Sequence, residues 1–174
     1  MTYTSLLRYG ILVSSLIYSN IALATPPSKA NEAKAVSFVA ADSLGKKIDL
    51  GQYAGKTVLL SFYSVGCKMC GRDLKLMREF YRDNASKNFV ILGVSLEKTK
   101  AEFDMYSKMV ALSIPSNQQF PLIWKGNVHA TEDLSNISND PTHIVIDPNG
   151  QIILKREGSF KPEDWDNLWE SIAR

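Results

Sequence analysis

Apolar and polar residues follow two different periods along this chain, and the change of period separates strands from helices. Residues 57–63 (TVLLSFY) form a nearly continuous apolar, β-branched and aromatic run, which is typical of a central strand buried on both faces. After Gly71 the apolar positions recur at helical spacing, while charged residues, Asp73 among them, take the other positions. The recurring apolar positions are Leu74, Met77, Phe80 and Tyr81. This pattern predicts an amphipathic helix from near Cys67 to around Asn84.

Two segments have the pattern of a β-hairpin. Within residues 36–56, short apolar-rich runs flank the turn sequence Asp42-Ser43-Leu44-Gly45. Further along, residues 142–147 (THIVID) and 151–156 (QIILKR) flank Pro148-Asn149-Gly150. Each segment therefore predicts a pair of antiparallel strands joined by a turn that contains glycine.

The remaining segments complete an alternation of strands and helices. They are a buried strand at 89–96, a helix at 98–112, a short strand at 119–124, a polar loop with one turn of helix at 125–140, and a helix at 162–174. Pro121 in the short strand favours an edge position. The order β-β, βα, βα, β-β, α predicts an α/β fold in which a mixed central sheet has helices on both faces.

The N-terminus departs from this pattern. A single charged residue, Arg8, precedes a largely apolar stretch that ends in the small-x-small sequence Ala22-Leu23-Ala24. We expect residues 1–24 to be a secretory signal peptide that is cleaved, residues 25–35 a flexible leader, and residues 36–174 the folded domain. The alternative is an uncleaved N-terminal anchor. Cleavage would place the protein in the periplasm.

Composition and charge limit the classes of function. The chain has 174 residues, of which 45% are hydrophobic and 22% charged, as expected for one globular domain. Its formal net charge of +2 is close to balance, so we expect no nucleic-acid partner. The protein is expected to act as a monomer.

The two cysteines of the chain, Cys67 and Cys70, lie in the sequence GCKMCG. This spacing allows a structural disulfide, half of a metal site or a reversible redox pair. A disulfide that closes so small a ring removes little chain entropy, so it would be a poor structural bond. A zinc-type site would need His129 and His143 as well, and these show no close pairing in the sequence.

The predicted secondary structure favours the redox pair. Cys67 is expected at or just before a helix N-terminus, where unpaired N–H groups and the helix dipole favour a thiolate. The dipole could lower the thiol pKa by about one unit, and Lys68 adds a positive charge. Cys70, one turn further, is expected to be more buried and able to attack a mixed disulfide on Cys67. Reversible thiol–disulfide exchange needs these two roles.

The cysteine region resembles the exported TlpA/ResA/DsbE-type branch of thioredoxin-fold proteins. The similarity lies in GKTVLLSFYSVGCKMC, in the helix and strand that follow, and in DPTHIVIDPNGQII. The hairpin VAADSLGKKIDLGQYAGKTVLL resembles the N-terminal extension of that branch, so the resemblance covers nearly all of residues 36–174. It implies a thioredoxin-like fold and a thiol–disulfide oxidoreductase without a cofactor.

The resemblance also implies roles for particular residues. Cys67 would be the nucleophile and Cys70 the resolving thiol of the catalytic pair. Pro141 would be a cis-proline that faces the pair, where the preceding backbone at Asp140 can bind an extended segment of a protein substrate. Relatives of this branch mostly act as reductants in cytochrome c or oxidase maturation and are recharged by a membrane thiol reductase. We expect the same kinds of partner here, and no metal in the active site.

The chain departs from the family pattern at three positions. Gly66 replaces the usual aromatic residue before the first cysteine, and Ser61 lies where many relatives have an acidic or amide residue, so Ser61 is expected to be structural. Asp140, before the expected cis-proline, is the third unusual residue. If it faces Cys67, its negative charge should raise the thiol pKa and oppose Lys68. The alternative for Asp140 is a solvated turn residue.

Other functions fit the cysteine motif less well. A copper-binding assembly protein on the same fold could use Cys67, Cys70, Met69 and a histidine as soft ligands for Cu(I). A peroxidase of the peroxiredoxin kind needs a cysteine flanked by proline and threonine, and the sequence has no such motif. The direction of exchange depends on the redox potential, which Lys68, Met69 and Asp140 are expected to modulate.

Overall fold

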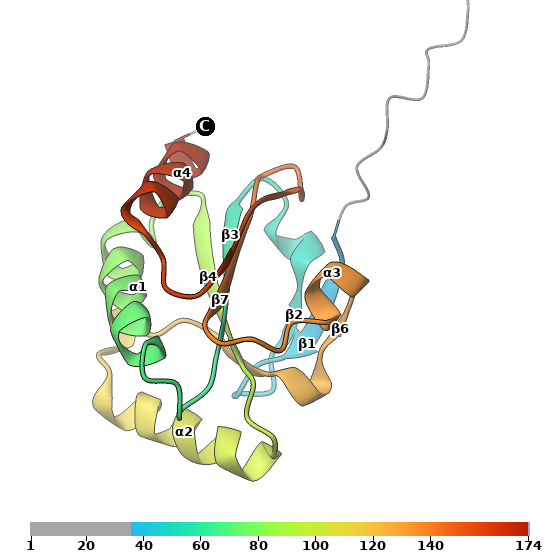
Figure 1. Ribbon diagram of the computed structural model, residues 1–174, viewed down its shortest axis with the longest axis vertical. Helices are drawn as coiled ribbons and strands as arrows, with labels where there is room; N and C mark the ends of the chain where they lie inside the picture. The colour runs from blue at the N-terminus through green and yellow to red at the C-terminus, as the bar shows by residue number, and fades with distance from the viewer. Residues whose placement is uncertain (1–35, 174) are drawn as a thin grey trace, which may run out of the picture. The chain divides into compact units, whose positions relative to one another are not determined.

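Five strands form the central sheet of the protein, in the order β5–β4–β3–β7–β8 (Figure 1). A computed structural model describes residues 36–173, so the predicted signal peptide and leader lie outside the described residues. The strands are β3 (Thr57–Tyr63), β4 (Phe89–Ser95), β5 (Leu122–Trp124), β7 (Thr142–Ile146) and β8 (Ile152–Glu157). β3 runs parallel to β4 and antiparallel to β7. The predicted mixed sheet is therefore confirmed, with β5 at an edge as Pro121 indicated.

Three helices cover one face of this sheet. They are α1 (Cys70–Asn84), α2 (Lys100–Ser113) and α4 (Pro162–Ala173). Alternate residues of the strands, such as Leu59 and Ile91, pack against their apolar stripes. The helical side chains in this core are Leu74, Met77, Phe103, Val110, Leu168 and Ile172. The periodicity of 3.6 residues in the sequence thus corresponds to a real buried face.

A smaller sheet covers most of the other face. It has the order β2–β1–β6 and consists of β1 (Phe38–Ala41), β2 (Lys47–Asp49) and β6 (His129–Ala130), beside the one-turn helix α3 (Glu132–Ser135). In Figure 1 this sheet and α3 lie on the opposite side of the central sheet from α1 and α4. Its apolar residues meet Val58, Leu60 and Phe62 of β3 in a second core.

Residues 125–140 contain more structure than a polar loop. Besides the expected turn of helix, β6 pairs with β1 through Phe38↔Ala130 and Val39↔His129. A strand of two residues is too short to produce an alternating pattern, so the sequence does not reveal it. Short 3₁₀ helices occur at Leu50–Tyr53, Ser116–Gln118 and Lys125–Asn127.

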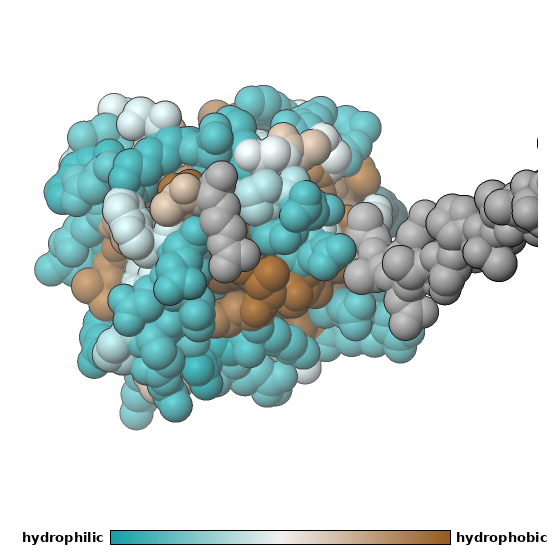
Figure 2. Space-filling view, turned by 90° about the horizontal axis from the view of Figure 1, so that it is seen from above, coloured by the Kyte–Doolittle hydropathy of each residue, from teal (hydrophilic) through white to brown (hydrophobic). Residues whose placement is uncertain are grey.

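Both predicted hairpin turns contain a glycine with positive φ, which other residues rarely adopt. Gly45 has φ of 79° and Gly150 has φ of 80°. Figure 2 looks onto the end of the molecule that is uppermost in Figure 1, where α4 and the β7–β8 turn lie. This surface is mostly hydrophilic, with apolar side chains gathered near its centre. Among residues 36–173, no helix has the length and apolar character needed to cross a membrane.

Candidate redox site

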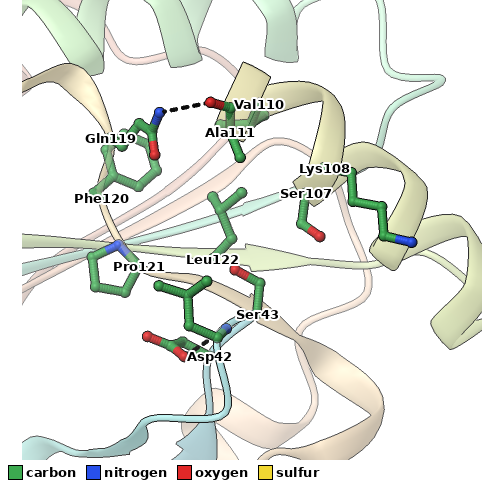
Figure 3. A pocket seen from close by; sticks show the side chains of 11 residues that line it. Asp42, Ser43, Ser107, Lys108, Val110, Ala111, Gln119, Phe120, Pro121 and Leu122 are labelled. Atoms are coloured by element: carbon green, nitrogen blue, oxygen red, sulfur yellow. Dashed lines mark hydrogen bonds between the residues drawn. The ribbon is translucent and has the colours of Figure 1, made fainter. Parts of the chain in front are cut away.

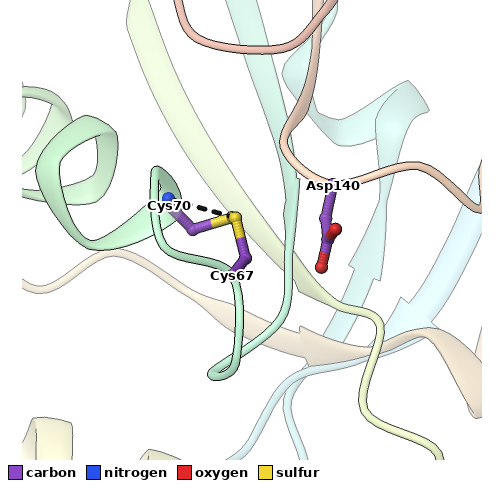
Figure 4. A group of neighbouring side chains, drawn as sticks. All are labelled: Cys67, Cys70 and Asp140. Carbon is purple, nitrogen blue, oxygen red and sulfur yellow. Dashed lines mark hydrogen bonds between the residues drawn. A yellow bond between two sulfur atoms is a disulfide. The ribbon is translucent and has the colours of Figure 1, made fainter.

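The two cysteines form a disulfide at the junction between β3 and α1 (Figure 4). Their Sγ atoms are 2.08 Å apart and their Cα atoms 5.4 Å apart. The buried strand β3 ends at Tyr63, and the chain turns through Ser64–Met69 before α1 begins. The hydrophobic strand and the amphipathic helix, both fixed by the core, therefore hold the two ends of this turn.

The helix begins later than the sequence suggested. It starts at Cys70, so Cys67 lies in the turn just before the helix, which is one of the two positions expected for it. The backbone N–H of Cys70 nevertheless donates a hydrogen bond to Cys67 Sγ at 3.1 Å (Figure 4). The apolar period that predicts the helix begins only after Gly71, so it does not fix the exact first residue, and the structure has a turn up to Met69. The interaction of the helix N-terminus with Cys67 is retained.

The two sulfur atoms differ in accessibility. Cys70 is 2% exposed and packs in the core under α1, whereas Cys67 is half-buried. Lys68 and Met69 between them are both exposed. Within the part of the chain that the structure describes, Lys68 forms no ion pair. Because an exposed charge is screened by water, Lys68 acts only weakly on the sulfur atoms.

Asp140 lies beside the cysteine pair. One carboxylate oxygen of Asp140 and the two Sγ atoms all lie within 4.8 Å of one another. The hydroxyl of Ser64 donates a hydrogen bond to the Asp140 carboxylate, so the side chain is directed toward the cysteine turn. The next peptide bond, Asp140–Pro141, is cis. The structure thus brings Asp140 from the loop before β7 to the sulfur atoms, as Figure 4 shows, and Pro141 follows it directly in that loop.

A buried acid–histidine pair lies in the core behind the cysteine turn. Asp73 of α1 and His143 of β7 are 2% and 1% exposed, and His143 Nε2 is 3.3 Å from Asp73 Oδ2. In the sheet His143 of β7 lies opposite Ser61 of β3, the residue expected to be structural. Among the described residues, neither Ser61 Oγ nor His143 Nδ1 has a hydrogen-bond partner. The core behind the cysteines therefore contains an acid and a histidine, Asp73 and His143, although Ser61 itself is not an acidic residue.

The surroundings keep Asp73 ionised. Burial alone would raise the pKa of its carboxyl group. Hydrogen bonds from His143 and Ser159 and the charge of His143 lower the pKa by more than burial raises it, so the net pKa lies below the ordinary value. The prediction that Asp73 belongs to the polar face of the helix was wrong. Its place three residues after Cys70 and four before Met77 puts it on the buried face, and this spacing was the available signal.

Cys67, Cys70 and Asp140 are also the one group of three possible metal ligands within residues 36–173. Neither histidine joins this group, because His143 contacts Asp73 and His129 lies on β6. A carboxylate suits hard cations, whereas two thiolates suit soft ones. The donor set therefore differs from the cysteine, methionine and histidine ligands considered for Cu(I).

A separate hollow of about 350 Å³ lies between the C-terminal half of α2 and the start of β5 (Figure 3). Its polar lining residues are Asp42, Ser43, Ser107, Lys108 and Gln119. None of its lining residues belongs to the cysteine turn or to the loop before β7. We therefore assign it no part in chemistry at the disulfide.

Comparison with known proteins identifies similar chains. Residues 32–155 match the model of the AhpC/TSA family. The chain is 26% identical over 152 residues to the thiol-disulfide oxidoreductase ResA of Bacillus subtilis (strain 168), covering 86% of this chain and 81% of that protein. It is 29% identical over 140 residues to the protein of the same name from Geobacillus thermodenitrificans (strain NG80-2), with 79% and 75% covered.

Solved structures resemble the fold as well. A putative thiol:disulfide interchange protein DsbE from Chlorobium tepidum superimposes with a TM-score of 0.60 at 25% sequence identity, covering 79% of this chain and 91% of that chain. The fold of this chain and its N-terminal hairpin are therefore of the thioredoxin-like type that the sequence predicted.

Proposed function

Because the chain belongs to the AhpC/TSA family and is a thiol–disulfide oxidoreductase of the ResA/DsbE type, we propose a direction for its reaction. The protein reduces disulfides of protein substrates outside the cytoplasm. Cys67 is the nucleophile and Cys70 the resolving thiol. The observation that carries this assignment is the asymmetry of the pair: a half-buried Cys67 is disulfide-bonded to a Cys70 that is 2% exposed.

The proposed cycle begins with both cysteines reduced. The Cys67 thiolate attacks one sulfur of a substrate disulfide, that S–S bond breaks, and the first substrate sulfur leaves as a thiolate and takes up a proton. Cys70 then loses its proton and attacks Cys67 Sγ, which releases the second substrate sulfur. Two electrons have passed to the substrate, and Cys67–Cys70 is left as the disulfide that the structure contains.

The hydrogen bond from the Cys70 N–H supports the first step. A thiolate at Cys67 would accept the same backbone N–H that its sulfur accepts in the disulfide form. Hydrogen bonding to the charged form favours that form and lowers the thiol pKa. The nearby Asp140 carboxylate opposes this effect. Lys68 and Met69 are exposed beside Cys67 and are proposed to modulate its potential through their contacts with partner proteins.

Substrate binding is assigned to the loop before β7. The carboxylate of Asp140 lies next to the sulfur atoms, and the cis bond to Pro141 follows. The backbone of this residue is proposed to pair with an extended substrate segment. We propose that the substrates are oxidised cysteine pairs whose thiols are needed for haem attachment or copper insertion, and that a membrane thiol reductase returns the Cys67–Cys70 disulfide to thiols. The protein is proposed to act as a monomer in the periplasm after removal of its signal peptide.

Trapping of mixed disulfides tests the exchange mechanism. Cys70→Ser removes the resolving thiol, so this variant should accumulate mixed disulfides through Cys67, and Cys67→Ser should accumulate none. Equilibration of the wild type with glutathione mixtures then gives the potential. A potential of about −270 mV, as in thioredoxin, supports a reductant. A potential of about −120 mV, as in DsbA, indicates an oxidant. Failure of the reduced Cys70→Ser variant to trap any disulfide-containing substrate would exclude exchange.

A second candidate function is metal delivery, because Cys67, Cys70 and Asp140 place three donor atoms within 4.8 Å of one another. In that case the reduced protein should bind Cu(I) in competition with a chelator. Asp140→Asn should then weaken binding if the carboxylate is a ligand. Tight Cu(I) binding together with an absence of trapped mixed disulfides would replace the proposed function by this one.

A further inference from the structure

A groove lies beside the cysteine turn on the side of α2. Its volume is about 350 Å³, and we refer to it as the methionine groove. Its lining residues are Val65, Glu97, Glu102, Met105, Tyr106 and Met109. Val65 belongs to the turn that carries Cys67, and the four residues from Glu102 to Met109 belong to α2. The groove is therefore lined on one side by the cysteine turn and on the other by α2.

The groove presents apolar side chains to solvent. Met105 is 70% exposed, Val65 56% and Met109 51%. On the same helix Phe103 and Val110 are buried, whereas about half of the Met109 side chain faces solvent at the groove. Flexible methionine side chains adapt to differently shaped partners and are common on surfaces that bind several proteins.

The wall next to Cys67 is held in place by hydrogen bonds. The N–H of Val65 donates to Glu97 Oε1 at 2.6 Å. The indole N–H of Trp124 donates to the carbonyl of Glu97 at 2.9 Å, and the N–H of Leu96 donates to the carbonyl of Tyr63 at 2.7 Å. The end of β4 is thus tied to the cysteine turn on one side and to β5 on the other. Val65 is two residues from Cys67, so their Cα atoms are at most about 7 Å apart.

The two acids of the groove are already engaged. Glu97 accepts the N–H of Val65, and Glu102 Oε2 accepts both the N–H and the hydroxyl of Thr99 at the start of α2. The remaining lining is apolar apart from the hydroxyl of Tyr106, which accepts a hydrogen bond from Arg78. The groove therefore suits an apolar side chain, and its two carboxylates disfavour an acidic segment.

We propose that the methionine groove binds an apolar side chain of the substrate protein that lies two or three residues from the substrate cysteine. This inference rests on the proposed function, since exchange brings that cysteine into a covalent bond with Cys67. An extended chain advances about 3.3 Å per residue, so a side chain two or three residues away lies roughly 7–10 Å from the bond. Val65, the lining residue nearest to Cys67 in the chain, lies within that reach, and the lining favours segments that are apolar and not acidic.

A set of activated peptides tests the groove. Three nine-residue peptides have a central cysteine joined to thionitrobenzoate through a disulfide, and have leucine, serine or glutamate two residues from that cysteine. Attack by Cys67 of the reduced protein releases thionitrobenzoate, whose absorbance gives the rate constant. The wild type should react with the leucine peptide roughly three to ten times faster than with the serine peptide, since partial burial of leucine is worth part of its full transfer energy. The glutamate peptide should be slowest.

Variants locate the preference in the groove. Met105→Gln/Met109→Gln keeps the length of both side chains and should remove the preference for leucine, while its rate with dithiobis(nitrobenzoate), a small reagent, stays at the wild-type value. Leu112→Gln is the matched control, because Leu112 is 89% exposed on the same helix and does not line the groove. This control should keep the preference.

Several outcomes would overturn the inference. The first is that the wild type reacts at equal rates with the leucine and serine peptides. The second is that the double variant keeps the preference for leucine. The third is that the double variant loses as much rate with the small reagent as with the leucine peptide, which would place the effect in the chemistry of the cysteines. A wild-type dimer that the double variant dissociates would identify the groove as a self-association surface. A wild type that reacts with neither peptides nor small reagent would refute the proposed function itself.

Discussion

At the scale of single residues, Asp140 and Lys68 differ in how strongly they can act on Cys67. The sequence placed charges of opposite sign near the thiol without ranking them. In the structure the Asp140 carboxylate lies within 4.8 Å of both sulfur atoms and accepts a hydrogen bond from Ser64, whereas Lys68 is exposed to water. A partly buried charge is screened less than an exposed one. Asp140 should therefore be the stronger influence of the two.

We expect Asp140→Asn to lower the pKa of the Cys67 thiol, because a neighbouring negative charge that disfavours the thiolate has been removed. The pH dependence of the alkylation rate of the reduced protein measures this pKa. Asp133→Asn, which changes an exposed acid on α3, is the control and should leave the pKa unchanged. An unchanged or higher thiol pKa in Asp140→Asn would show that the carboxylate does not act on Cys67.

Other features at this scale were beyond the reach of the sequence. The pattern could identify Cys67 and Cys70 because their spacing has a chemical meaning of its own. The contact between Asp73 and His143 joins residues 70 positions apart on α1 and β7, and only the packing of that helix on that strand brings them together. A sequence shows the periodicity within an element, but it does not show which side chain of one element meets which side chain of another.

At the scale of elements, the start of α2 is fixed by a capping box. Thr99 Oγ1 accepts the N–H of Glu102, and the Glu102 carboxylate accepts the N–H of Thr99. This arrangement satisfies two backbone groups that would otherwise lack partners at the helix terminus. It also positions Glu102 at the edge of the methionine groove.

Thr99→Ala should lower the free energy of unfolding by about 1 kcal/mol, because the backbone N–H of Glu102 loses its partner. Urea denaturation of wild type and variant measures this difference. Thr99→Ser retains the hydroxyl and should recover most of the loss. If alanine and serine at this position gave equal stabilities, the cap would contribute nothing to α2.

Most elements were predictable because each carries its own periodicity. Strands β3, β4, β7 and β8 and helices α1, α2 and α4 appear close to their expected positions. The start of α1 was expected three residues too early, since the turn at Ser64–Met69 has no apolar period that separates it from the helix. β6 was missed because its two residues become a strand only by pairing with β1.

At the scale of the whole molecule, two buried acids link stability to pH. Asp164 is 1% exposed and accepts hydrogen bonds from Arg156 at 2.8 and 2.9 Å. Hydrogen bonds from Arg156, opposed by burial, lower the pKa of its carboxyl group. The pKa of Asp73 is lowered as well, by hydrogen bonds that outweigh the effect of burial. Both acids therefore hold a proton less readily in the folded protein than in the unfolded chain.

Stability should consequently fall in acid. The unfolded acids have pKa values of about 3.9, so the unfolded chain binds more protons once the pH approaches that value from above. The contribution of both carboxylates to the free energy of unfolding is fully present above about pH 5. It is lost as the pH falls through the lowered pKa values that these groups have in the folded protein. Urea midpoints measured from pH 6 to pH 2.5 test this expectation.

Asp164→Asn should be less stable than the wild type near neutral pH and should show a shallower decline in acid, because one of the two titrating groups is gone. Asp133→Asn should follow the wild-type curve, since that side chain is exposed. A curve for Asp164→Asn parallel to the wild type throughout would mean that Asp164 does not contribute to the acid dependence.

The pairing of β6 with β1 limits how far the domain could be shortened. Residues 129–130 are joined to the N-terminal hairpin, and the chain continues from them through α3 to Asp140. Phe38 and Ile48 of that hairpin are completely buried against β3. A minimal version trimmed to the five-stranded sheet would leave Val58, Leu60 and Phe62 facing water and would free the stretch that delivers the cis-proline loop. An engineer who wanted a compact redox module would have to keep the hairpin.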